Sequence, residues 1–253
     1  LAKDGMTDIL TKTHSGRYVM SSREPIYQLL MLLPLLVIYE IAAVLINFDT
    51  PFQLRNGADI LVKQALHKMG IRSVFGFVMV TLLFVSLLIV AAYKKYRGKL
   101  KAHYFPSMLL ESAIYAFVIG IASARLTGLV MGCNPFLAVG APATLAQRLM
   151  IGVGAGVYEE IVFRALLITA MLLAMKFFGV AEKHRGLIAI VGSAVLFSAF
   201  HYVGEFGEAF ILTTFVFRTV AGLLLSAIYV LRGIGVSAWS HALYDIFLVF
   251  GLL

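Results

Sequence analysis

The chain has 253 residues, of which 61% are hydrophobic and only 13% are charged, and it carries a net charge of +8. This balance excludes a soluble domain of average composition. Surplus lysine and arginine are typical of the cytoplasmic loops of membrane proteins, so we expect the lipid bilayer, and no nucleic acid, as a partner. Apolar stretches recur from Pro25 onward, and about 20 such residues cross roughly 30 Å of hydrocarbon as a helix.

Apolar segments long enough to form transmembrane helices follow one another along the chain. They cover residues 26–46, 74–93, 108–131, 145–175, 187–203, 209–231 and 236–252. The segment 52–69 is less apolar and carries Lys63 and Lys68, which predicts an amphipathic interfacial helix or a short eighth element. The predicted fold class is all-α, with a polar N-terminal segment, 1–24, before a single transmembrane domain of seven or eight helices, 25–253.

Basic residues in the predicted loops indicate an orientation. Those on one side under simple alternation of the spans are Lys3, Lys12, Arg17, Arg23, Lys94, Lys95, Arg97, Lys99, Lys101, Lys176, Lys183, Arg185 and Arg232. We expect that side to be the cytoplasm, because cytoplasmic loops are rich in lysine and arginine. Arg55, Lys63, Lys68 and Arg72 fall on the opposite side and conflict with this rule. The sequence therefore predicts a multi-pass protein of a prokaryotic cell membrane with a cytoplasmic N-terminus.

Ionisable side chains inside apolar helices are costly and normally face a bundle interior or a watery cavity. In the second half of the chain they are Glu159, Glu160, Arg164, His201, His241 and Asp245. Glu160 and Arg164 are four residues apart, so they share a helical face and can pair, while Glu159 points about 100° away. A lone carboxylate in an apolar site is a better general base, which makes Glu159 the candidate base.

Two further pairs share a helical face, His241 with Asp245 and Phe197 with His201. Peptide hydrolysis needs a positioned water, a base, oxyanion donors and an acid for the leaving amine. Each set alone can be explained by a purely structural role, such as a packing ion pair, an interfacial histidine or a helix cap. Together they favour a catalytic site, because unrelated buried charges in three helices would each need separate compensation.

The remaining polar and small residues of the spans receive structural interpretations. Arg125 and Arg218 lie in apolar spans, where either can pair with Glu40, Glu111 or a lipid phosphate. Glycines 152 and 156 fit a small-xxx-small contact that lets a neighbouring helix approach closely.

Three motifs in order carry a resemblance to a known family. They are Glu159-Glu160-x-x-x-Arg164, Phe197-x-x-x-His201 and His241-x-x-x-Asp245. They resemble the CAAX prenyl protease and bacteriocin-processing (CPBP, Abi) family of intramembrane endopeptidases, over about residues 145–250. The resemblance implies a glutamate-dependent peptidase without metal or cofactor, acting on a membrane-tethered protein or peptide with or without a lipid. The substrate's identity and the oligomeric state stay open.

The resemblance also implies roles for these residues. Glu159 and His201 would activate the water, His241 and residue 245 would hold the oxyanion, and Glu160 with Arg164 would support the site. The family usually has asparagine at the last position, whereas an ionised Asp245 cannot donate to an oxyanion. Either Asp245 is held protonated or it orients His241, and we favour the orienting role. Counting along the helices places Glu159 about 25 Å and His241 about 13 Å from the cytoplasmic ends, a gap that tilt or a broken helix must close.

Two other functions compete with the peptidase. A zinc metallopeptidase would use Glu159, His201, His241 and Asp245 as ligands, but the chain has no HExxH helix. A proton-coupled transporter or noncatalytic membrane protein would also bury such residues, although the inverted repeats typical of transporters are not visible in the sequence.

Overall fold

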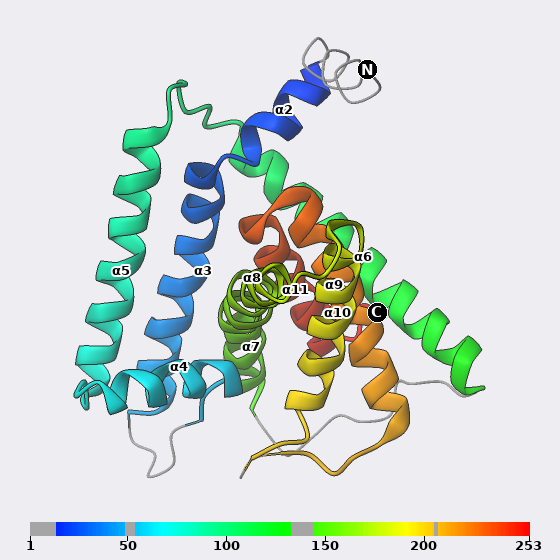
Figure 1. Cartoon of the computed structure of the whole chain (residues 1–253). Helices are drawn as coiled ribbons and strands as arrows, with labels where there is room; N and C mark the ends of the chain where they lie inside the picture. The colour runs from blue at the N-terminus through cyan, green and yellow to red at the C-terminus, as the bar shows by residue number, and fades with distance from the viewer. Residues whose placement is uncertain (1–13, 49–53, 133–143, 205–206) are drawn as a thin grey trace, which may run out of the picture.

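The computed structural model describes residues 14–48, 54–132, 144–204 and 207–253 (Figure 1). These ranges form helices and turns without a strand, which confirms the predicted all-α fold class. The elements are α2 (His14–Ser22), α3 (Pro25–Ile46), α4 (Gly57–Lys68), α5 (Val74–Lys95), α6 (Tyr104–Met131), α7 (Leu145–Gly154), η1 (Ala155–Ile168), α8 (Thr169–Phe177), α9 (Glu182–Phe200), α10 (Leu212–Arg232) and α11 (Ile234–Val249). Of the predicted polar segment 1–24, residues 1–13 lie outside the described residues.

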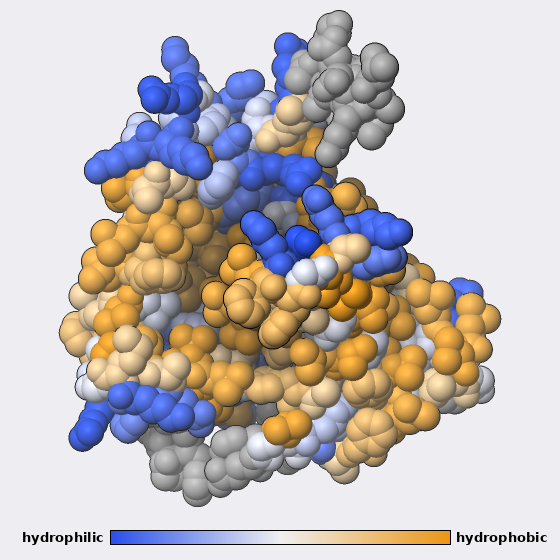
Figure 2. Space-filling view, in the orientation of Figure 1, coloured by the Kyte–Doolittle hydropathy of each residue, from blue (hydrophilic) through white to orange (hydrophobic). Residues whose placement is uncertain are grey.

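Each predicted span corresponds to a helix or a run of helices. Within the described residues, five helices are long and apolar enough to cross a membrane: α3, α5, α6, α9 and α10. The predicted span 145–175 is one helical run of three parts, α7, the π-helical segment η1 and α8, and the last span corresponds to the shorter apolar helix α11. Hydrophobic side chains dominate the middle of the face in Figure 2, with hydrophilic ones gathered mainly toward its ends. The protein is a multi-pass integral membrane protein.

Helix α4 does not span the membrane. Its 12 residues are too few to cross the hydrocarbon, and Figure 1 shows it lying across the ends of α3 and α5. Asn56 caps its N-terminus, where the side-chain oxygen accepts a hydrogen bond from the backbone N–H of Ala58 at 2.9 Å. This agrees with the interfacial or short eighth element expected at 52–69.

Helix α11 packs against α3, α6, α7, η1 and α10 and therefore lies at the centre of the bundle. Glycines make its close approach possible. A Cβ atom on Gly156 would lie 2.6 Å from the carbonyl oxygen of Ala238, and one on Gly152 would lie 2.9 Å from Cβ of Asp245. The small-xxx-small contact predicted for these two glycines is confirmed, and its partner is the helix that carries His241 and Asp245.

The turn between α10 and α11 is recessed into the protein. Gly233 adopts a φ of 96°, which suits glycine, and Arg232 before it is buried with both Nε and Nη2 bonded to Glu111 at 2.6 and 2.8 Å. Just after the turn, the backbone N–H of Gly235 donates to Gln28 on α3. Helix α11 thus begins inside the bundle rather than at its surface.

Candidate active site

Three elements bring the predicted residues together. Glu159, Glu160 and Arg164 lie on η1, His201 ends α9 as its C-cap residue, and His241 and Asp245 lie on α11. Glu159, Glu160, Arg164 and His241 are buried, and His201 and Asp245 are partly buried. Oε2 of Glu159 lies 3.9 Å from Nε2 of His241. The acids and imidazoles of separate helices therefore face one another.

The two glutamates sit on a π-helical segment, which spacing alone does not reveal. The predicted helical faces assume α-helical geometry, whereas residues 155–168 form i→i+5 hydrogen bonds. Such segments are rare, and short π-helical turns occur often at functional sites. The predicted pairing nevertheless forms, with Nη1 of Arg164 2.9 Å from Oε1 of Glu160.

Glu160 connects three polar side chains that surround the site. Its Oε1 forms an ion pair with Arg164 and, at 2.8 Å, a hydrogen bond with Nδ1 of His241, while its Oε2 accepts from the hydroxyl of Ser237 at 2.6 Å. The guanidinium of Arg164 also lies 4.4 Å from the ring centroid of Phe197. Ser237 was missed by the sequence analysis, although it is four residues before His241 and so shares its face.

These contacts fix the orientation of His241. A carboxylate that forms an ion pair with Arg164 and accepts from Ser237 has no proton to donate, so the proton of the shared bond lies on Nδ1 of His241. Nε2 then faces Glu159 at 3.9 Å and Asp245 at 3.8 Å, and neither distance is a hydrogen bond. The orienting partner of His241 is therefore Glu160, and the role favoured for Asp245 does not agree with this geometry.

His201 is oriented by its own helix. Its Nδ1 lies 3.0 Å from the carbonyl oxygen of Phe197, which only accepts, so Nδ1 carries the proton and Nε2 of the neutral ring holds the lone pair. Both imidazoles lie edge-on to Phe197, with ring centroids 5.2 Å away for His201 and 5.9 Å for His241. The shared face predicted for Phe197 and His201 is present, and Phe197 packs against both histidines.

Glu159 has a partner that the sequence did not indicate. Its Oε1 accepts a hydrogen bond from Nδ2 of Asn56 at 2.8 Å, across 103 positions of the chain. Among the described residues, Glu159 forms no ion pair with a lysine or arginine, unlike its neighbour Glu160. The predicted division between one neutralised and one uncompensated glutamate is therefore seen in the structure.

The other intramembrane charges pair differently from the sequence interpretation. Nη2 of Arg218 donates to both carboxylate oxygens of Glu208, at 2.8 and 2.9 Å. The suggested pairing of Arg218 with Glu40 or Glu111 is therefore wrong. Glu111 bonds Arg232, and Glu40 lies within a cluster built around α4. None of these pairs shares a helix, so the four-residue spacing of a helical face did not identify them.

Comparison with known families identifies a match in the second half of the chain. Residues 141–247, somewhat under half of the chain, match the family described as type II CAAX prenyl endopeptidase Rce1-like. No curated protein and no solved structure matches the chain. The matched range holds all six predicted site residues, whereas α3 to α6 lie outside it, and the family is one of proteases. Over this segment the chain is similar to the Rce1-like family of CAAX prenyl endopeptidases, in agreement with the resemblance of its three motifs.

Proposed function

We propose that the protein is a glutamate-dependent endopeptidase that cleaves a peptide bond near the C-terminus or membrane anchor of a membrane-tethered substrate. One observation carries this proposal. The uncompensated carboxylate of Glu159 faces His241 at 3.9 Å in a buried site, and a second imidazole, that of His201, packs on the same phenylalanine as His241.

The proposed reaction assigns a task to each group. Glu159, helped by Nε2 of His201, takes a proton from a water molecule whose oxygen attacks the scissile carbonyl carbon. Protonated His241, which Glu160 orients through Nδ1, donates Nε2–H to the resulting oxyanion. The C–N bond then breaks, the leaving nitrogen takes the proton held by Glu159, and the products are a carboxylate and an amine.

The substrate class we propose is a peptide with a prenylated cysteine in a C-terminal C-a-a-X sequence. Two facts support it: the family description names such substrates, and the helices around the site expose apolar side chains such as those of Leu166 and Leu196 to the bilayer. A lipid on the substrate would keep the peptide at the membrane, where the buried site lies. Peptides anchored by a hydrophobic segment are the second class to test.

The decisive experiment uses the full chain in liposomes and a fluorogenic peptide that ends in a farnesylated C-a-a-X sequence, beside the same peptide without the lipid. Glu159→Gln should lower kcat by about 100- to 10,000-fold, the usual contribution of a general base. Glu182→Gln makes the same change at an exposed glutamate of α9 and should leave kcat unchanged.

Other outcomes would overturn the proposal. Cleavage that persists in Glu159→Gln would remove the glutamate mechanism. Cleavage that a chelator abolishes and zinc restores would favour the metallopeptidase. Proton flux through the liposomes, without cleavage of either peptide, would favour a transporter.

A further inference from the structure

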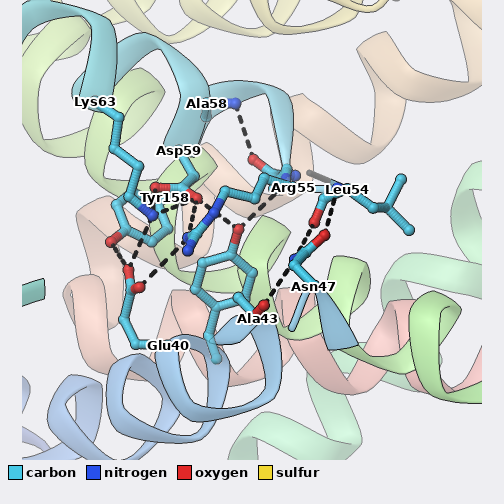
Figure 3. Close-up of polar contacts among 11 residues, drawn as sticks. Glu40, Ala43, Asn47, Leu54, Arg55, Ala58, Asp59, Lys63 and Tyr158 are labelled. Atoms are coloured by element: carbon cyan, nitrogen blue, oxygen red, sulfur yellow. Dashed lines mark hydrogen bonds and ion pairs between the residues drawn. The ribbon is translucent and has the colours of Figure 1, made fainter. Parts of the chain in front are cut away.

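A cluster of buried charges joins α4 to the bundle, and the proposed reaction does not use it. The cluster contains Asp59 and Lys63 of α4 and Arg55, which lies just before the α4 N-cap. These side chains meet Glu40 of α3, which also accepts from the hydroxyl of Tyr158 of η1 (Figure 3). Asp59 lies 3.0 Å from Arg55 and 2.8 Å from Lys63, while Glu40 lies 3.4 and 3.5 Å from the same two cations. Two cations thus face two carboxylates, so the buried charge is balanced.

The cluster also fixes the position of Asn56, the N-cap residue of α4. Its backbone N–H donates to the hydroxyl of Tyr39 at 3.2 Å, and the same hydroxyl donates to Asp59 at 2.7 Å. The next residue, Gly57, lies so close to α9 that a Cβ there would be 3.2 Å from the ring of Phe200. Asn56 is 5% exposed. The N-terminus of α4 is therefore held from three sides, by α3, by the cluster and by α9.

The two ends of the Asn56 amide have different partners. Its oxygen accepts from the backbone N–H of Ala58 and caps α4, and its nitrogen donates to Oε1 of Glu159 at 2.8 Å. An N–H group faces one end and a carboxylate the other, so these partners fix which end is oxygen and which is nitrogen. Aspartate can cap a helix but cannot donate to a carboxylate. Serine can cap as well, but its side chain is shorter and lacks the amide nitrogen.

We propose that Asn56 is a positioning residue for Glu159, supplied by a helix outside the segment that matches the protease family. This inference rests on the proposed function of Glu159 as the base. The amide holds Oε1, so rotation of the carboxylate is restricted and Oε2 is kept toward His241 and the site of the attacking water.

The test compares Asn56→Ser and Asn56→Asp, which both keep a capping oxygen, in the full chain with the farnesylated fluorogenic peptide. Each should lower kcat by about 10- to 100-fold, the effect expected from losing a hydrogen bond to a charged group, while KM changes less than about threefold. This separation of kcat from KM is the readout, because a residue that only capped α4 would leave kcat unchanged in variants that keep the capping oxygen.

Asn47→Ala is the matched control. Asn47 bonds the backbone of Ala43 and Leu54 in the connection before α4, so its loss loosens the same region without touching Glu159. It should lower the unfolding temperature and leave kcat unchanged. Wild-type kcat in either folded Asn56 variant would overturn the inference. The same assay with Glu159→Gln separates the two proposals, since an active Glu159→Gln enzyme removes the proposed function itself.

Discussion

Nδ1 of His241 lies 2.8 Å from Oε1 of Glu160, although the two residues are 81 positions apart in the chain. The same oxygen bonds Arg164, which is fully buried, so Glu160 both orients the imidazole and neutralises a cation. Glu160→Gln should lower kcat by about tenfold or more and cost about 3–5 kcal/mol of stability, because it leaves a buried charge uncompensated. Thermal unfolding in detergent, together with the cleavage assay, measures both effects.

The comparison for that loss of stability is Glu208→Gln. Glu208 pairs with Arg218, but its side chain is 52% exposed, and exposed pairs contribute only about 0–1 kcal/mol. A Glu160→Gln protein as stable as Glu208→Gln would contradict the account of Glu160 as the compensating charge.

Gly156→Ala should separate η1 from α11. The new Cβ would meet the carbonyl oxygen of Ala238 at 2.6 Å and Cβ of Ala242 at 2.7 Å, and overpacking of this kind costs about 1–3 kcal/mol. Activity should fall as well, because the two helices carry Glu159 and His241. Gly186→Ala is the matched control in α9, where a Cβ would meet nothing within 4 Å and alanine should stabilise the helix slightly. Equal unfolding temperatures for the two variants would contradict this packing argument.

The balanced cluster at α4 predicts a rescue. Asp59→Leu leaves Arg55 and Lys63 facing the single carboxylate of Glu40, so it should cost about 3–5 kcal/mol. Adding Lys63→Met removes the surplus cation and leaves the Arg55–Glu40 pair. The double variant should regain most of the stability, with a coupling of about 0.5–3 kcal/mol in a double-mutant cycle. A double variant less stable than Asp59→Leu would show that the two residues act independently.

The sequence predicted what depends on local patterns. Hydropathy located the helices, and four-residue spacing identified the Glu160–Arg164 pair. The sequence could not predict the contact between Asn56 and Glu159, because α4 has the composition of a surface helix and 103 positions separate the two residues. The contact between Glu160 and His241 was also hidden, since 81 positions separate the two residues. Long-range packing decides such features, and a single sequence carries no direct signal of it.

The proposed orientation can be tested by cysteine labelling. Arg55 and Lys63 are on the side opposite to the one that the loop charges predict to be cytoplasmic. Both form ion pairs with Glu40 and Asp59, so they do not act as free positive charges against this orientation. In a Cys133→Ser background, Lys99→Cys should react with an impermeant maleimide only in inverted vesicles, as expected for a cytoplasmic loop.

Met69→Cys reports the opposite side in the same background. Met69 is 78% exposed at the end of α4, and its cysteine should react in right-side-out vesicles. The reverse labelling pattern for both cysteines would invert the proposed topology.

Asp245 stands where the family usually has asparagine, and its geometry predicts that the amide is tolerated. Glu160 already orients His241, and Oδ2 of Asp245 lies 3.8 Å from Nε2, too far for a hydrogen bond. An asparagine side chain at this position would have nearly the same shape against Gly152 and could donate to an oxyanion. Asp245→Asn should therefore keep kcat within about fivefold of wild type, whereas Asp245→Leu, which offers no polar group, should lower it about 100-fold. Complete loss of cleavage in a folded Asp245→Asn enzyme would show that the carboxylate itself is required, and would return the orienting role to Asp245.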